Sequence, residues 1–237
     1  MIDGIFKAAD GLEAYAKNQE VIARNLANVN TVGFKRNIID FKTVLAEFGA
    51  GRNESLQANV GIDFSKGVHN YTGNSLDMAI DGDGFFTIET EQGLRYTRNG
   101  QFQLSDNGEI VTLSGGKLLG GGGPLVIPRG NSEIKIDSEG VVKVGEGREI
   151  GTILINNFED TSVLVPAGAG LFKASFEASQ NTGDFKIAQG YLENSNVNIV
   201  MEMVNMISNM RSHESSNNIM KTFSDTIKRL IDTQSNV

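Results

Sequence analysis

Residues 200–210 read VMEMVNMISNM and form the most apolar part of a long helical pattern near the end of the chain. Apolar side chains recur there at three- and four-residue spacing, as on one side of an α-helix. Four of the seven methionines lie in this interval, and methionine adapts its packing to surfaces of uneven shape. After a polar patch at 211–218, the apolar pattern resumes with Ile219, Met220, Phe223, Ile227, Leu230 and Ile231. We expect a single helix over about 196–233, on the order of 50 Å long.

A second helical pattern occupies residues 3–30. Apolar positions alternate over almost four heptads, with Gln19 as the polar interruption. These positions are Ile5, Ala8, Leu12, Tyr15, Ile22, Leu26 and Val29. Gly4 and Gly11 each lower helix stability by up to about 1 kcal/mol relative to alanine, so this helix needs a partner. We expect the Ile5–Val29 seam to face the Val200–Ile231 stripe, although an ordinary helical hairpin core is a plainer interpretation.

The middle of the chain has a period of two and many turn residues. Asn99-Gly100 and Asn107-Gly108 are dipeptides typical of hairpin turns. We expect a mixed α and β fold, in which paired, coiled-coil-like terminal helices flank an inserted glycine-rich all-β domain. The expected division is 1–35 for the N-terminal helix and turn, 36–69 for a linker or extended segment, 70–185 for the β-rich domain and 186–237 for the C-terminal helix.

The composition excludes several classes of protein. A formal net charge of −8 argues against nucleic-acid binding, which needs a basic face toward the phosphates. The absence of cysteine excludes disulfides and zinc–thiolate sites, and His69 and His213 are the two histidines. No run approaches the roughly 18 apolar residues of a membrane span, and the N-terminal residues lack the features of a cleaved Sec-type signal.

The motifs that could carry chemistry fail on spacing. Asp77, Asp81 and Asp83 suggest a calcium loop, but counting from Asp81 places Phe85 and Gln92 at two liganding positions. A tight turn is the favoured interpretation. The glycine-rich segment 115–124 lacks the spacing and the hydroxyl residue of a phosphate-binding loop. We therefore expect no catalytic residue, no metal site and no cofactor, and we interpret His213 as a surface or interface residue.

Several stretches resemble, in order, the signatures of the flagellar rod and hook family. They are NLANVNTVGFK at 25–35, LDMAIDGDGFF at 76–86, YTRNGQF at 96–102, and GYLENSNVN at 190–198, which leads into EMVNMI at 202–207. The signature residues that carry over are Asn25, Asn28, Gly33, Phe34, Asn196 and Asn198. Together these blocks span nearly the whole chain.

The resemblance implies a structural subunit of the bacterial flagellar basal-body rod, which is not an enzyme. It implies polymerisation with copies of itself and with other axial rod and hook proteins into a torque-transmitting shaft. It also implies export by the flagellar type III apparatus without a cleaved signal, location of the rod in the periplasmic space, and no insertion into the membrane. Terminal helices would form the inner tube, with the β-domain outside. The short chain, the compact segment 46–70 and the GGGPL sequence at 121–125 favour a proximal-rod position over a distal-rod or hook-type one.

The candidate assembly interface combines the N-terminal seam with residues of the C-terminal stripe. Those residues are Val200, Met203, Val204, Met206, Ile207, Met210 and Ile227. An extracellular β-domain enzyme or carbohydrate-binding module with a coiled-coil tether is the rival interpretation. The glycine-rich β region with exposed carboxylates supports it, whereas the lack of tryptophan and the seams at both ends argue against it. Polymerisation separates the two interpretations.

Overall fold

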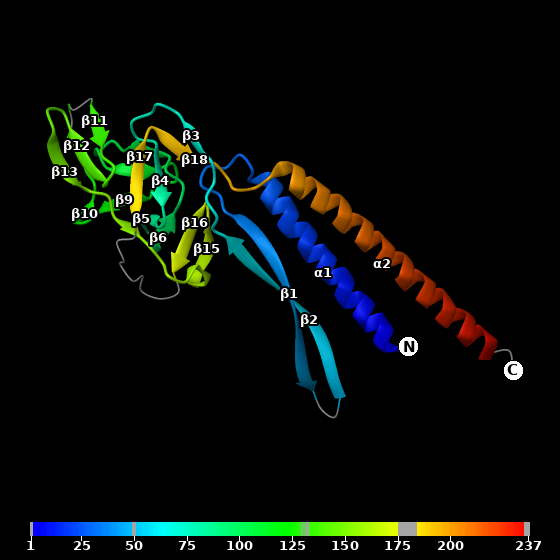
Figure 1. Ribbon diagram of the computed structural model, residues 1–237. Coiled ribbons are helices and arrows are strands. Elements are labelled where there is room, and N and C mark those ends of the chain that lie inside the picture. Colours follow the sequence, from blue (N-terminus) through cyan, green and yellow to red (C-terminus); the bar gives the residue numbers. More distant parts are fainter. Residues whose placement is uncertain (1, 49–50, 129, 131–132, 175–183, 235–237) are drawn as a thin grey trace. The chain divides into compact units, whose positions relative to one another are not determined.

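The computed structural model describes residues 2–48, 51–128, 130, 133–174 and 184–234, with side chains described except at 2–8, 41–48, 51–58 and 230–234 (Figure 1). The chain divides into two compact units. The helical unit comprises Met1–Asn28, Arg36–Asp63 and Val197–Val237, and the β unit comprises Val29–Lys35 and Phe64–Asn196.

The helical unit contains helices α1 (Ile2–Ala27) and α2 (Ile199–Gln234), which lie side by side (Figure 1). It also contains a long antiparallel hairpin of strands β1 (Arg36–Phe48) and β2 (Gly51–Asp63). The register runs from Arg36 opposite Asp63 to Phe48 opposite Gly51. Most of the segment expected as a linker or extended segment is therefore a hairpin. Its β-branched and aromatic residues favour strands, but no turn dipeptide marks the hairpin in the sequence.

The β unit is built of short strands around one core. Its main sheet has the order β15-β16-β6-β5-β9-β8-β7, with β10 on β9 and β14 on β5, and smaller sheets pair β11-β12-β13, β17-β4 and β18-β3. The strands of the main sheet are β5 (Phe85–Thr90), β6 (Gly93–Thr97), β7 (Phe102–Leu104), β8 (Ile110–Thr112), β9 (Lys117–Gly120), β10 (Gly123–Pro124), β14 (Ile155–Asn156), β15 (Leu164–Gly168) and β16 (Leu171–Ala174). The others are β3 (His69–Tyr71), β4 (Met78–Gly82), β11 (Ile134–Ile136), β12 (Val141–Val144), β13 (Arg148–Thr152), β17 (Phe185–Gln189) and β18 (Tyr191–Glu193), with a short 3₁₀ helix at Thr161–Val163.

The core of the β unit is apolar and fully enclosed. Met78, Ile80, Phe86 and Ile88 have at most 1% of their surface exposed, and Phe86 packs edge-to-face on Phe102. Strands β17 and β18 belong to this unit, because they pair with β4 and β3. The division predicted from the sequence ends the β-rich domain at 185 and so assigns most of β17 and all of β18 to the C-terminal segment, because runs this short carry little periodicity.

The two hairpin-type dipeptides have different outcomes. Asn107-Gly108 joins β7 and β8, which pair with each other, so that prediction is confirmed. Asn99-Gly100 lies between β6 and β7, and these strands do not pair; a hairpin there is wrong. Instead, the Asn99 side chain accepts a hydrogen bond from the Gln101 N–H at 2.9 Å. A Cβ at Gly100 would lie 1.5 Å from the Met78 carbonyl oxygen, so close backbone approach requires this glycine.

Candidate assembly interface

The apolar stripe at the start of α2 is exposed to solvent in the subunit. Val200 is 68% exposed, Ile207 54% and Met210 58%. The other large apolar residues of this exposed stripe are Ile199, Met203 and Val204. A contiguous group of exposed apolar side chains of this size is unusual on the surface of a soluble monomer.

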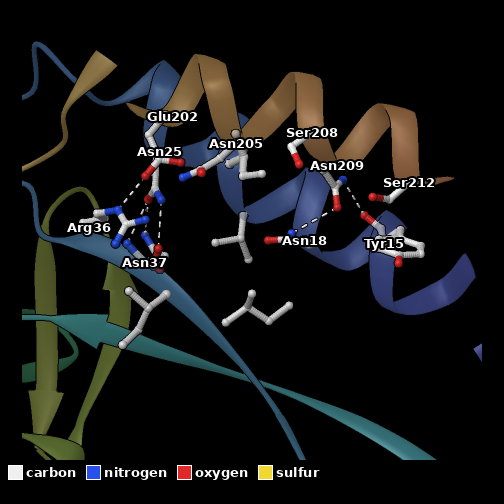
Figure 2. A pocket seen from close by; sticks show the side chains of 14 residues that line it. Tyr15, Asn18, Asn25, Arg36, Asn37, Glu202, Asn205, Ser208, Asn209 and Ser212 are labelled. Carbon is white, nitrogen blue, oxygen red and sulfur yellow. Dashed lines mark hydrogen bonds and ion pairs between the residues drawn. The ribbon is translucent and has the colours of Figure 1, made fainter. Parts of the chain in front are cut away.

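The opposite face of α2 is polar and lies against α1. Asn209 is buried, and its side-chain NH2 donates to the Tyr15 carbonyl oxygen and to Gln19 Oε1, both at 2.9 Å. Its Oδ1 accepts a hydrogen bond from Asn18 Nδ2 at 3.0 Å (Figure 2). Both amide hydrogens of Asn209 and its oxygen are therefore paired with α1.

The predicted seam between the helices is therefore wrong in its α2 half. The helices do lie side by side, but Val200, Met203, Val204, Ile207 and Met210 are exposed, whereas Glu202 and Asn209 are buried. Because Glu202 and Asn209 are seven residues apart, they share one face of the helix. Met206 and Ile227 are half-buried. The physical reason is that Asn209, whose side-chain amide is fully hydrogen-bonded, lies on the face of α2 that packs on α1. The periodicity of the sequence alone does not identify such a residue.

The N-terminal half of the seam agrees better with the prediction. Ile22 is buried, and Leu12, Tyr15 and Leu26 are half-buried. Val29 lies beyond the end of α1 and belongs to the β unit. The side chains of Ile5, Ala8 and Ile231 lie outside the described residues.

Asn25 fixes the end of α1 to strand β1. Its side-chain Nδ2 donates to the Asn37 carbonyl oxygen and its Oδ1 accepts from the Asn37 N–H, both at 2.8 Å (Figure 2). The buried amide thus pairs with the strand backbone as a neighbouring strand would. Asn28 closes the last turn of α1, since its Nδ2 donates to the Arg24 carbonyl at 2.8 Å.

Strand β1 is also tied to α2. Arg36 Nε lies 2.5 Å from Glu202 Oε1, and the Glu202 side chain is 1% exposed. Asn198 caps the start of α2, because its Oδ1 accepts from the Met201 N–H at 3.1 Å. Helices α1 and α2 and strand β1 line a pocket of about 410 Å³ that is open to solvent and has amide, hydroxyl and charged groups on its walls (Figure 2).

Two other signature residues lie in the β unit, where the backbone is tightly constrained. Gly33 has φ +68°, and a Cβ there would lie 2.3 Å from the Asn99 nitrogen. Its N–H donates to the Glu193 carbonyl at 2.7 Å. Phe34 is half-buried, with its N–H bonded to the Thr31 carbonyl at 3.2 Å. The glycine at this position is therefore a steric requirement.

A buried ion cluster lies next to this turn. Lys35 Nζ is 2.6 Å from Glu193 Oε1, and both side chains are 1% exposed. Lys35 also donates to the Ser65 carbonyl at 2.8 Å, and the Gly67 N–H donates to Glu193 Oε1 at 2.8 Å. Arg98 Nη1 lies 3.6 Å from Glu193 Oε2; burial lowers the pKa of Arg98, and the negative charge of Glu193 opposes that shift.

The cluster joins four segments of the β unit that are distant in sequence, at 33–35, 65–67, 98 and 193–196. Asn196, a signature residue, donates to the Ser65 carbonyl and to Ser65 Oγ, both at 3.0 Å. Sequence reasoning assigned no role to Lys35 or Glu193, although both lie within the signature stretches. The one feature of the sequence that could have pointed to them is that each is a charged residue within a signature stretch.

The remaining polar candidates have structural surroundings. Asp77 is buried and accepts hydrogen bonds from Thr72 Oγ1 at 2.7 Å and Asn74 Nδ2 at 3.2 Å, while Asp81 and Asp83 are exposed. Within the described part of the chain, no group of three or more histidine, aspartate or glutamate side chains could hold a metal ion. His213 is half-buried on α2 beside Asn217. None of the helices in the described ranges is long and apolar enough to cross a membrane.

Comparison with known proteins gives matches along nearly the entire chain. Family models match residues 7–35 (flagella basal body rod protein), 79–144 (flagellar hook protein FlgE/F/G D1 domain) and 188–233 (flagellar basal body rod FlgEFG protein C-terminal). The flagellar basal-body rod protein FlgG of Bacillus subtilis (strain 168) is 31% identical over 260 residues, covering 98% of each chain. The flagellar basal-body rod protein FlgF of Mesorhizobium japonicum is 32% identical over 239 residues, again covering 98% of each.

Proposed function

Because the chain belongs to the flagellar basal-body rod protein family, we propose that it assembles into the rod through the exposed apolar stripe of α2. The protein is a structural subunit of the rod in the flagellar basal body, and its family is not one of enzymes. A β-domain binding module on a tether is not favoured, since the matches include both terminal helices.

The observation that carries the proposal is the exposure of large apolar residues along one face of α2. Fully burying one such side chain stabilises a contact by roughly 1.5–3 kcal/mol, and each is already partly covered in the subunit. The stripe as a whole, covered by a neighbour, therefore provides several kcal/mol. A contact between two different surfaces of like subunits does not close on itself and so generates a helical polymer.

Family membership supports assembly with other rod and hook proteins. We extend the proposal to export through the flagellum's own type III apparatus without a cleaved signal peptide. We also propose that the rod segment lies in the periplasmic space and transmits torque. Relatives named FlgG and FlgF match at similar identity. For the position within the rod we propose the proximal part, on the basis of the short chain and the compact segment 46–70.

Replacing Ile207 by aspartate tests the interface. Because Ile207 is 54% exposed in the subunit, the Ile207→Asp variant should fold and melt like the wild type. In the rod the carboxylate would be buried without an evident partner, which costs several kcal/mol per subunit. We expect cells carrying the variant to lose rod assembly and motility.

Ser215→Asp is the matched control, since it adds the same charge to an exposed position of the same helix. Arg148→Asp, on an exposed strand of the β unit, is a second control. Both should leave stability within about 0.5 kcal/mol of the wild type and leave assembly intact. Normal rods in the Ile207→Asp strain would show that the stripe is not an assembly surface.

A further inference from the structure

Helix α2 presents two faces that could pack on α1. One is the exposed apolar stripe, and the other carries Glu202 and Asn209. The seam of α1 contains Leu12, Ile22 and Leu26, for which an apolar partner face would be the favourable choice in water. The structure nevertheless places the polar face of α2 against α1. A specific contact must therefore favour this orientation.

Asn209 is the residue of α2 with direct hydrogen bonds to α1. It is 6% exposed, both of its amide hydrogens are donated to α1, and its oxygen accepts from α1. If α2 turned its stripe toward α1, Asn209 would leave these partners, and Asn18 and Gln19 would face apolar side chains. An unpaired polar group against an apolar surface is strongly unfavourable. A buried asparagine in a helix pair is known to specify alignment at the expense of stability.

Glu202 opposes such a rotation of α2 less strongly than Asn209 does. Its Oε1 is paired with Arg36, but its Oε2 is buried without a hydrogen-bond partner. Turning Glu202 outward would expose that oxygen to water and relieve its desolvation. The ion pair also ties α2 to β1 and not to α1. Among the hydrogen bonds described above, those that join α2 directly to α1 all involve Asn209.

We propose that Asn209 is a positioning residue that keeps the apolar stripe of α2 turned outward, available to the next subunit. This inference rests on the proposed function of the stripe. Without Asn209 the stripe would turn toward α1 and be covered within the subunit. Packing of the stripe on α1 within the subunit would then compete with its packing on another subunit.

The test follows the reactivity of a single introduced cysteine, a residue type that the natural chain lacks. In the full-length Ile207→Cys protein, the thiol at position 207 should react readily with a maleimide. Adding Asn209→Ala should slow that reaction, on the order of tenfold for the loss of a few hydrogen bonds, as the stripe turns inward. The same double variant should assemble poorly, and Asn209→Gln, which keeps the amide, should recover part of both properties.

If Asn209 only stabilises the helix pair and does not orient α2, the labelling result is the opposite. The helix pair would loosen, the thiol at position 207 would react as fast or faster, and the melting temperature would fall. That outcome overturns the inference. Ser215→Cys in the Asn209→Ala background monitors general changes of helix α2. The Ile207→Asp experiment is independent: if it abolishes assembly while Asn209→Ala leaves labelling unchanged, the stripe is the interface and Asn209 does not orient it.

Discussion

Gly33 is a residue whose identity follows from local geometry. Its backbone has φ +68°, and the Asn99 nitrogen occupies the space of a Cβ. The resemblance identified Gly33 from sequence, and the structure supplies the reason. Lys35 and Glu193, close to it in space, were not identified, because their burial depends on a contact between residues 158 positions apart. Charged residues in a sequence are interpreted as surface unless their partner is known.

Replacing Gly33 by alanine separates backbone strain from steric clash. The control is Gly170→Ala, since Gly170 has φ +71° but a Cβ added there would meet open space within 4 Å. Gly170→Ala should cost about 1–2 kcal/mol, the strain of a left-handed conformation. Gly33→Ala should cost more, because Asn99 must also move. Chemical denaturation of both variants checks this, and equal losses would mean that the clash with Asn99 is relieved without cost.

At the scale of elements, the sequence predicted both helices closely, since each has a long periodic pattern. The helix expected at 196–233 is found at Ile199–Gln234. Periodicity shows that an apolar face exists but does not show what covers it. The stripe of α2 therefore looked like the intrachain seam, while Asn209, an ordinary polar residue in sequence, occupies the inner face.

Asn25 provides a test of how α1 is fixed to the hairpin. The Asn25→Asp change keeps the shape of the side chain but replaces its NH2 donor by a carboxylate oxygen. That oxygen would face the Asn37 carbonyl oxygen, which accepts a hydrogen bond from Asn25 at 2.8 Å in the wild type. The free energy of unfolding should fall by about 1–3 kcal/mol. Helical circular dichroism during thermal unfolding measures it. Asn30→Asp, at an exposed position, should have little effect. Equal melting of the two variants would contradict a role for Asn25 in fixing α1.

At the scale of the whole molecule, the order of the elements was largely predictable and the division into units was less so. The helix–β–helix order followed from changes of period. The β1–β2 hairpin and the assignment of β17 and β18 to the β unit were not expected, because both depend on strand pairing between segments with weak local signals. Membership of the rod family was recognisable from short stretches such as 25–35 and 190–198, which the family matches at 7–35 and 188–233 overlap.

The apolar stripe of α2 is exposed in the subunit, and we propose that a neighbouring subunit covers it in the rod. Maleimide labelling of the full-length Ile207→Cys protein, compared between free subunits and isolated rods, tests it most directly. We expect fast labelling of the free subunit and strong protection in rods, with Ser215→Cys, on the polar part of the same helix, less changed. Equal labelling at position 207 in the two states would contradict the claim.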